Sequence, residues 1–463
     1  MLFNSYPFIF IFLPISLLGY FALHRLKQKT VAQAWLALSS IFFYGWWNVQ
    51  HVPLLLGSIL FNYFIGRMIL RAGASEAVKM KKWVLMLGLL GNILLLGYYK
   101  YRDFLILNWN ELTGSQIGLL QLVLPLGISF FTFTQIAYLV DCYRGMAKSY
   151  GMIDYVLFVT FYPHLIAGPI IHHREMMPQF EEMQTKRWDW TNVSHGCFLF
   201  CIGLFKKVVI ADTFAGFADI GFMNAAHFFD SWAAALSYTI QLYFDFSGYS
   251  DMAIGLALFF NVRLPQNFDS PYKARSIQDF WQRWHMTLSR YLRDYIYIPL
   301  GGNRKGTVKA IRNTIITFVI GGLWHGAGWT FIVWGLMHGL ALAVHRLWNL
   351  TRYKLPGCIA WGLTFLFINV TWVVFRAENG SQAIRILKGM FGLQGIESSI
   401  SLSSAGVWLA IMILLPIIYL APNSTELNER LAFRRGTALA MAAFFVISLL
   451  FLNRITTFLY FNF

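Results

Sequence analysis

Charged residues are scarce in this sequence, and acidic residues are the scarcest of them. Only 13% of the 463 residues are charged, whereas 57% are hydrophobic and 18% are aromatic. A soluble protein carries about 25% charged residues, so this composition excludes an ordinary soluble globular protein. The mean hydropathy of +0.54 indicates a polytopic membrane protein instead.

Cysteine is also scarce, and the motifs of several function classes are missing. The four cysteines (Cys142, Cys197, Cys201 and Cys358) form no Cys-x-x-Cys pair, which argues against a disulfide framework or a cysteine zinc site. The sequence has no Gly-rich phosphate loop, no Gly-x-Ser-x-Gly elbow and no zinc-protease helix. It also shows neither internal repeats nor the inverted pair of broken helices found in many transporters.

The hydrophobic residues form runs long enough for transmembrane helices. A span takes about 20 apolar residues, and the sequence predicts roughly 11–13 spans. They centre on residues 6–23, 31–47, 52–70, 83–99, 117–140, 153–171, 196–211, 232–260, 308–323, 328–345, 359–375, 405–420 and 437–453. The run at 232–260 is long enough for two segments or a broken one. Because the connecting loops are short, we expect a single all-α membrane domain over residues 1–463.

Basic residues outnumber acidic ones and cluster in the loops between the spans. The 37 Lys and Arg against 21 Asp and Glu give a net charge of +16. Clusters at residues 25–29, 67–82, 346–354 and 430–435 fit the positive-inside rule and predict an extracytoplasmic N-terminus. They do not indicate nucleic-acid binding. The first span is followed by its basic residues and lacks a cleavage site, so we expect a retained anchor.

A first unusual stretch covers residues 161–173. It contains Pro163, Gly168 and Pro169 within seven residues, and such a run cannot form a regular helix. A broken apolar segment is typical of a re-entrant loop that is buried against protein.

A second unusual stretch, residues 241–252, places Asp245 and Asp251 inside an apolar run. The two carboxylates are six residues apart, so on an unbroken helix they point in different directions and need not pair with each other. Buried carboxylates require partners, and we therefore interpret both as holding helices together. A proton relay is the alternative.

The third stretch, residues 264–302, predicts an amphipathic helix. Residues 276–279 resemble a capping box, and apolar residues then recur at helical spacing until Pro299 and Gly301-Gly302 end the helix. We expect this helix at the cytoplasmic face of the membrane, with its arginines toward headgroups or an anionic ligand. His285 lies at the border of the apolar stripe.

A histidine also lies inside a hydrophobic run. His325 has glycines and tryptophans on both sides within Ile315–Val344, and an ionisable residue at membrane depth is costly and usually functional. The glycines open space and are expected to break or bend the helix here, and the aromatic residues limit hydration and keep the imidazole neutral. A neutral imidazole can take a proton from an attacking hydroxyl, and a hydrogen bond between helices is the alternative. We interpret His338 as structural.

Three further histidines, His164, His172 and His173, lie close together in the sequence. The adjacent pair points apart, and no acidic residue has the spacing of a metal ligand. We therefore predict no metal site.

Together these stretches resemble the membrane-bound O-acyltransferase (MBOAT) family, in particular its bacterial AlgI-like branch. The matching segments follow the family order, and they are residues 161–180, 245–252, 267–289, 293–303 and 322–326. The resemblance implies membrane helices around a central tunnel, with re-entrant and amphipathic helices, in the bacterial inner membrane. The signature core would span residues 153–345.

The resemblance also implies roles for particular residues. His325 takes the position of the catalytic histidine and His285 that of the second signature histidine. The expected donor-binding residues are Arg283, Arg290, Arg293, Lys273, Trp284 and Asn267. Structural or tunnel-lining roles fall to Asp245, Asp251, Pro169 and Trp324.

The implied reaction is O-acetyl transfer from acetyl-CoA in the cytoplasm to an extracytoplasmic polysaccharide such as alginate, cellulose or peptidoglycan. Arginine suits the phosphates of acetyl-CoA. A carrier-protein thioester, as in teichoic acid D-alanylation, is the alternative donor. His325 would act as general base while His285 positions the donor or polarises its carbonyl, and an acetyl-histidine intermediate is the rival mechanism.

The expected partners are a separate periplasmic acetyltransferase of the SGNH serine-hydrolase type, the polysaccharide machinery and membrane lipid. We expect no permanently bound cofactor, no metal and no nucleic acid. The alternative functions are a transporter or flippase of a polysaccharide export complex, and a structural scaffold of such a complex. The sequence leaves the polymer open.

Overall fold

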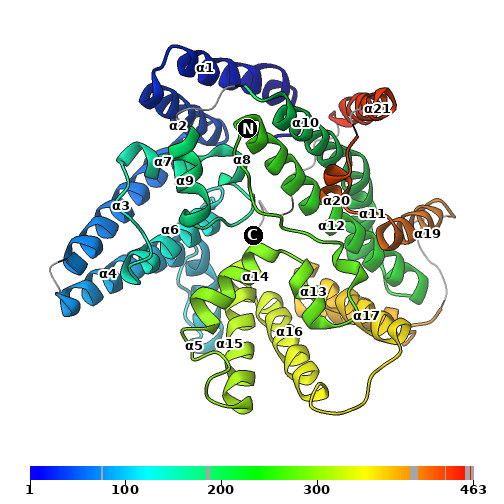
Figure 1. Ribbon diagram of the computed structural model, residues 1–463. Helices are drawn as coiled ribbons and strands as arrows, with labels where there is room; N and C mark the ends of the chain where they lie inside the picture. The colour runs from blue at the N-terminus through cyan, green and yellow to red at the C-terminus, as the bar shows by residue number, and fades with distance from the viewer. Residues whose placement is uncertain (75–76, 184–187, 397–404, 433, 454–458, 460–463) are drawn as a thin grey trace. The chain divides into compact units, whose positions relative to one another are not determined.

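The computed structural model describes residues 1–74, 77–183, 188–396, 405–432, 434–453 and 459 (Figure 1). These residues form helices and connecting segments, and the described part of the chain contains no strand. The chain divides into two compact units. Unit 1 comprises Met1–Phe200 and Met252–Pro265, and unit 2 comprises Cys201–Asp251 and Gln266–Phe463.

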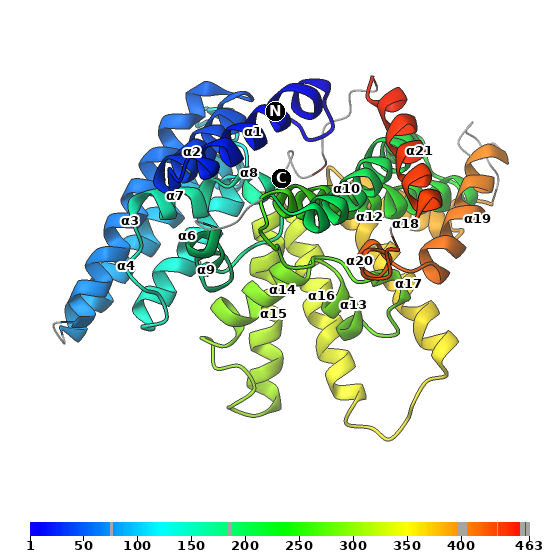
Figure 2. The same cartoon turned by 45° about the horizontal axis from the view of Figure 1, so that its top comes forward.

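Unit 1 is built from the N-terminal helices. Its elements are η1 (Phe8–Phe12), α1 (Leu13–Arg25), α2 (Lys29–Gly45), η2 (Val49–His51), α3 (Val52–Ala74), α4 (Val78–Leu96), η3 (Gly97–Tyr101), α5 (Arg102–Thr113), α6 (Ile128–Tyr143), α7 (Met152–Thr160), α8 (Tyr162–Leu165), α9 (His173–Met183) and most of α10 (Trp190–Phe205). Helices α3 and α4 lie side by side along their length (Figure 2).

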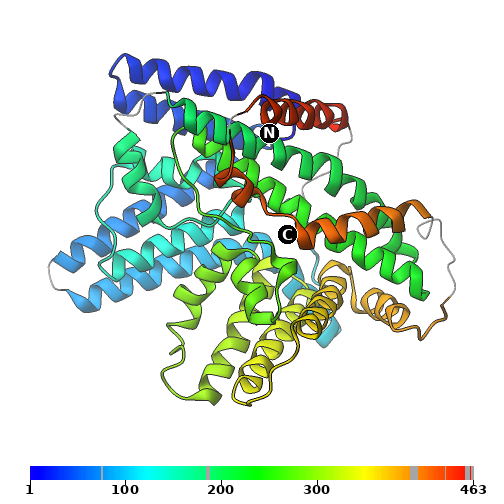
Figure 3. The ribbon, with the colours of Figure 1, turned by 45° about the vertical axis from the view of Figure 1, so that its right-hand side comes forward.

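Unit 2 holds the remaining helices. They are η4 (Lys206–Ala211), α11 (Asp212–Asn224), most of α12 (Phe228–Phe259), η5 (Pro271–Lys273), α13 (Ile277–Arg283), α14 (Met286–Leu292), η6 (Arg293–Tyr297), α15 (Thr307–His325), α16 (Trp329–Trp348), α17 (Gly357–Arg376), α18 (Gly380–Met390), α19 (Ala405–Leu420), α20 (Ser424–Glu429) and α21 (Arg435–Phe451). Helices α15, α16 and α17 pack next to one another in chain order (Figure 3).

The expected all-α, membrane-spanning fold is confirmed. Among the described residues, five helices are long and apolar enough to cross a membrane, and they are Phe8–Arg25, Val49–Ala74, Val78–Thr113, Trp329–Trp348 and Gly357–Arg376. Two shorter apolar helices follow, Gly406–Leu420 and Arg435–Phe451. The sequence predicted more spans, and several of the other predicted runs form helices of 16 or 17 residues, such as α2, α19 and α21.

Three of the predicted segments differ in the structure. Residues 117–127, inside the span expected at 117–140, are not helical, and α6 begins only at Ile128. The span expected at 153–171 is interrupted after Thr160, where a short helix containing Pro163 follows. The run at 232–260 is neither double nor broken, since α12 continues through both aspartates for 32 residues.

Close packing of α15 against α16 depends on glycine. A Cβ on Gly322 would lie 2.2 Å from the carbonyl oxygen of Phe331, and one on Gly335 would lie 2.3 Å from that of Phe318. These contacts leave no room for a side chain, so the two helices approach backbone to backbone. The turn Gly326–Gly328 joins them, and α15 therefore ends at His325, where the flanking glycines were expected to break the helix.

Candidate active site

The segment expected to form one amphipathic helix is two helices with a break at His285. The N-terminus is capped as expected, because Ser276 Oγ accepts a hydrogen bond from the Asp279 amide at 3.0 Å. The Asp279 carboxylate accepts from the amide of Arg275 rather than that of Ser276. Helix α13 then ends at Arg283, and His285 adopts a left-handed conformation with φ 44° and ψ 53°.

The break has a physical cause in the segment that contains Asn267. The Met286 amide donates to the Asn267 carbonyl at 3.0 Å, and the Asp269 amide donates to the Arg283 carbonyl at 2.9 Å. The Asn267 side-chain Oδ1 accepts from the amide and hydroxyl of Thr287 at 3.3 and 2.9 Å. These bonds satisfy groups that a continuous helix would use, and they hold His285 in a conformation that is strained for a non-glycine residue.

The Asn267 contact fixes the tautomer of His285. The ring Nδ1 lies 3.0 Å from Asn267 Oδ1, which can only accept, so Nδ1 carries the proton and Nε2 carries the lone pair. His285 is fully buried, and burial lowers its pKa to about 3. The imidazole is therefore neutral at physiological pH, with Nε2 as an acceptor.

His325, the last residue of α15, lies in a box of aromatic rings. Its ring centroid is 4.9 Å from that of Trp324, 5.1 Å from that of Trp334 and 5.2 Å from that of Phe375. Three helices, α15, α16 and α17, thus enclose an imidazole that is only 3% exposed. Trp329, the tryptophan on the other flank in the sequence, is 62% exposed and does not belong to this box.

The structure brings the two signature histidines to the same tryptophan. The Trp324 ring lies 4.9 Å from the ring of His325 and 6.1 Å from that of His285. The ring of Phe246 of α12 is perpendicular to that of His285, with the two ring centroids 4.7 Å apart. Two buried imidazoles from separate parts of the chain therefore lie near one indole.

The predicted donor-binding residues have different surroundings. Arg283 donates from Nε to Asp279 at 2.6 Å, which raises the pKa of the guanidinium, and its Nη1 lies 3.4 Å from Asp269. Lys273 donates to the Ala421 carbonyl at 2.7 Å. Trp284 is buried against Phe280 and Trp372, Asn267 supports His285, and Arg290 is half-buried on α14.

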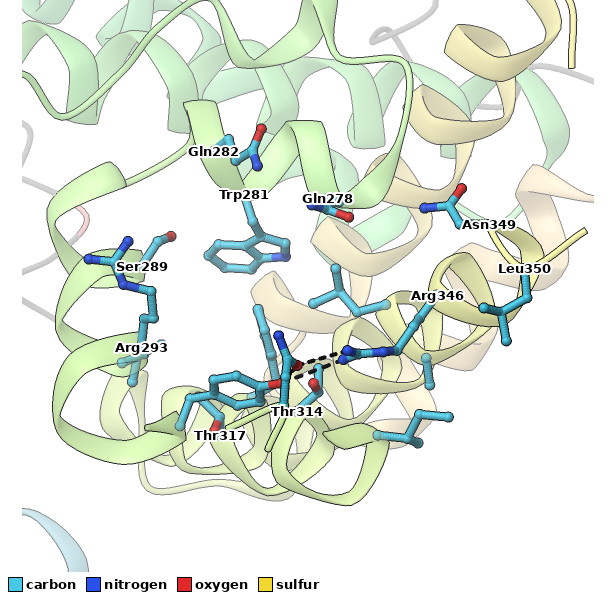
Figure 4. A pocket seen from close by; sticks show the side chains of 17 residues that line it. Gln278, Trp281, Gln282, Ser289, Arg293, Thr314, Thr317, Arg346, Asn349 and Leu350 are labelled. Carbon is cyan, nitrogen blue, oxygen red and sulfur yellow. Dashed lines mark hydrogen bonds between the residues drawn. The ribbon is translucent and has the colours of Figure 1, made fainter. Parts of the chain in front are cut away.

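Of those six residues, Arg293 lines the pocket shown in Figure 4. The pocket has a cavity volume of about 510 Å³ and is formed by α13, α14, η6, α15 and α16 with the loop at Asn303. Arg293 and Arg346 lie on opposite sides of it, with the Trp281 indole between them in this view (Figure 4). Its volume falls within the range of small-molecule sites, about 300–1,000 Å³.

Sequence reasoning missed Arg346, which it interpreted only as an orientation charge. Its Nη2 donates to Asn303 Oδ1 at 2.8 Å, and its Nη1 lies 3.5 Å from the Tyr297 hydroxyl (Figure 4). These contacts hold the guanidinium at the pocket. Only the position of Arg346 at the last turn of α16 could have drawn attention to it, since helix C-termini favour cations.

The acidic pair on α12 forms ion pairs with two lysines that the sequence analysis did not single out. Lys207 Nζ lies 2.7 Å from Asp245 and 2.6 Å from Asp212, and Lys206 Nζ lies 2.7 Å from Asp251. Ser424 Oγ donates to Asp251 at 2.6 Å. Each carboxylate thus joins α12 to η4, and Asp251 also joins it to α20.

Pro169 and the histidines of the first unusual stretch lie in unit 1. Pro169 is buried in the non-helical segment between α8 and α9. His164 Nε2 lies 3.0 Å from the carbonyl of Phe158. His173 has an acidic partner that sequence spacing missed, because its Nδ1 lies 3.2 Å from the Asp141 carboxylate of α6.

Comparison with known proteins gives one consistent result. Residues 90–377 match the model of the MBOAT, membrane-bound O-acyltransferase family. A peptidoglycan O-acetyltransferase of Helicobacter pylori is 50% identical over 86% of this chain and 81% of its own length. The probable alginate O-acetylases AlgI of Pseudomonas aeruginosa and Pseudomonas putida are 42% and 44% identical over 84% of this chain, and over 75% and 80% of their own lengths.

Proposed function

Because this chain belongs to the membrane-bound O-acyltransferase family, we propose that it transfers acetyl groups from cytoplasmic acetyl-CoA toward an extracytoplasmic polysaccharide. The chain is a multi-pass membrane acyltransferase. The names of its relatives, which act on peptidoglycan and alginate, support a polysaccharide as the final acceptor. The observation that carries the proposal is the pair of buried imidazoles, His285 and His325, that lie near the same Trp324 ring.

In the proposed reaction His325 is the general base. It takes the proton of an acceptor hydroxyl as the oxygen attacks the thioester carbonyl carbon. The carbon–sulfur bond breaks, and the leaving thiolate receives the proton from His325, so that the products are an acetyl ester and CoA. Attack by His325 itself, through an acetyl-histidine, is the rival route.

The tautomer of His285 favours one of its two expected roles. Its proton is on Nδ1 and is donated to Asn267, so Nε2 offers a lone pair rather than a proton. An acceptor cannot polarise a thioester carbonyl by hydrogen bonding to its oxygen. We therefore assign His285 to positioning, through an N–H or O–H group of the donor or acceptor.

The donor site is the pocket between Arg293 and Arg346. Arginines at a pocket rim bind phosphate through charge-assisted hydrogen bonds, and acetyl-CoA carries several phosphate groups. Arg346 belongs to the basic cluster that the positive-inside rule assigns to the cytoplasm. The pocket would then face the compartment that holds acetyl-CoA.

The proposed setting is the bacterial inner membrane, with the N-terminus outside and a tunnel linking the donor and acceptor sides. A separate periplasmic acetyltransferase of the SGNH type would receive the acetyl group and pass it to the polymer. Relatives named for peptidoglycan and for alginate support either polymer, and the identity at 50% to the first makes peptidoglycan the first to test.

The decisive experiment supplies radiolabelled acetyl-CoA to membranes that contain equal amounts of wild-type protein or His325→Ala. We expect label in polymer or partner protein with the wild type and little or none with the variant. His227→Ala removes a histidine whose Nδ1 lies 2.7 Å from the Gln394 carbonyl and which does not line the pocket, and this control should transfer normally. Label transfer that survives His325→Ala, or polymer flux without transfer, would favour a transporter instead.

A further inference from the structure

The pocket is separated from His325 by aromatic side chains. Trp281 of α13 lines the pocket and is 6% exposed, and Phe318 of α15 lines it next to Trp281 at a ring distance of 4.9 Å. Behind them lies Trp334, 5.8 Å from Trp281 and 5.1 Å from His325. A molecule in the pocket is therefore two aromatic layers away from the catalytic imidazole.

His338 holds the first layer in place. The Trp281 Nε1–H donates a hydrogen bond of 3.1 Å to His338 Nδ1, and the two rings are nearly perpendicular at 5.2 Å. His338 is fully buried, and the bond fixes its proton on Nε2. Trp281 is thus held by one specific polar contact rather than by packing alone.

Two polar atoms at this junction have no hydrogen-bond partner within the described residues. They are His338 Nε2 and Trp334 Nε1, and their side chains are almost wholly buried. The two rings are 4.7 Å apart. Native proteins rarely bury such groups unsatisfied, because each one costs stability. Both rings lie next to that of Trp281, at 5.2 and 5.8 Å, so the space behind the indole is lined by polar atoms as well as by aromatic rings.

We propose that the Trp281 indole, held by its hydrogen bond to His338, forms a partition between the pocket and His325. This partition limits the size of the acyl group that reaches His325. This inference rests on the proposed function, in which an acyl thioester occupies the pocket. The thioester reaches His325 only when the indole moves aside and gives up its bond to His338. The reacting group then occupies the space that the indole leaves, and the neighbouring rings of Phe318 and Trp334 bound that space.

The partition therefore explains a preference for a short acyl group. Acetyl is the smallest acyl group with a carbon chain, and it requires only a small displacement of Trp281. Each added methylene demands more room among rings that already contact one another at 4.9–5.8 Å. Removing the indole should admit longer acyl chains, and removing the His338 acceptor should have the same effect more weakly.

The test compares transfer from radiolabelled acetyl-, butyryl- and octanoyl-CoA in membranes with equal amounts of each full-length variant. For Trp281→Ala we expect the ratio of butyryl to acetyl transfer to rise about tenfold or more over the wild type, the scale of one or two methylenes in an apolar pocket. His338→Phe, which removes the acceptor, should raise the ratio about threefold. His338→Asn keeps an acceptor near the Nδ1 position and should restore the wild-type ratio.

The controls separate the possible failures. Trp348→Ala removes an exposed tryptophan of α16 away from the pocket lining and should leave the ratio unchanged. If the wild type transfers no acetyl group from acetyl-CoA, the proposed function is wrong. If it does, but Trp281→Ala and His338→Phe keep the wild-type ratio, the partition is wrong. Should Trp281→Ala fail to accumulate, the two His338 variants decide alone, because a purely structural histidine would change yield without changing the ratio.

Discussion

Unit 2 buries both carboxylates and imidazoles, and the two kinds of group are surrounded in opposite ways. The carboxylates of α12 are closed into ion pairs, Asp245 with Lys207 and Asp251 with Lys206, at 2.7 Å each. His285 and His325 instead lie among aromatic rings at 4.7–5.2 Å. A closed ion pair is poor at exchanging protons with a substrate, whereas a neutral imidazole among rings can do so. We call the ion pairs of Asp245 and Asp251 the charged layer, and His285 and His325 with their surrounding rings the aromatic layer. Substitutions in the charged layer should therefore change stability, and substitutions in the aromatic layer should change activity.

The largest effect should follow from removing His325. His325→Ala should lower acetyl transfer by about 10²–10⁴-fold, the usual contribution of a general acid–base group. Since the imidazole is enclosed by aromatic rings, the melting temperature of the purified protein in detergent should change little. Transfer is measured with labelled acetyl-CoA and melting by light scattering or intrinsic fluorescence. A His325→Ala protein with a much lower melting temperature would show that the aromatic layer also controls stability, which would contradict this division of roles.

Lys207 should show the reverse pattern. Lys207→Met leaves two buried carboxylates, Asp212 and Asp245, facing each other without a cation. Removing one partner of a buried ion pair costs about 3–5 kcal/mol, so we expect low yield and an early melting transition. The triple variant that also carries Asp212→Asn and Asp245→Asn should recover much of that loss. Normal stability of Lys207→Met would show that the charged layer has no structural role.

A third prediction concerns the support of His285. Asn267→Ala removes the acceptor for Nδ1 and for Thr287, and loss of such a support typically costs about 10–100-fold in activity. Asn267→Asp keeps the acceptor but adds a negative charge, which favours the imidazolium and raises the pKa of His285 from about 3. A protonated Nε2 no longer accepts a hydrogen bond.

The pH profile distinguishes the two Asn267 variants. Asn267→Asp should keep activity at high pH and lose it as the pH falls through the raised pKa, whereas the wild type stays neutral at His285 throughout. Asn267→Ala should be weak at every pH. Identical profiles for the wild type and Asn267→Asp would show that the protonation state of His285 does not matter.

The sequence predicted those features of the site that are caused by neighbouring residues, and it missed those that are caused by residues elsewhere in the chain. The cap at Ser276 and the end of α15 at His325 follow from neighbouring residues, and the sequence predicted both. The break at His285 does not, because it arises from Asn267, which is remote in the chain and takes over the amide of Thr287. The partners of the α12 carboxylates were missed for the same reason, since Lys206 and Lys207 lie in a separate predicted span, residues 196–211, and nothing in the sequence pairs them with the aspartates.

The smallest effect should come from the edge of the pocket, outside both layers. Arg346→Ala removes a guanidinium that Asn303 and Tyr297 hold at the pocket, and one charge-assisted hydrogen bond is worth about 1.5–3 kcal/mol. Because Arg346 is partly exposed, we expect about a tenfold rise in the KM for acetyl-CoA, with kcat nearly unchanged and the difference shrinking at high salt. Arg352→Ala, an exposed arginine of the same basic cluster that does not line the pocket, is the matched control. If both variants raise KM equally, the net charge of the loop attracts the donor and Arg346 has no specific contact with it. If kcat falls instead, Arg346 acts on the reacting group. The pocket would then take part in the reaction itself, and the division between a binding pocket and the aromatic layer at His325 would be wrong.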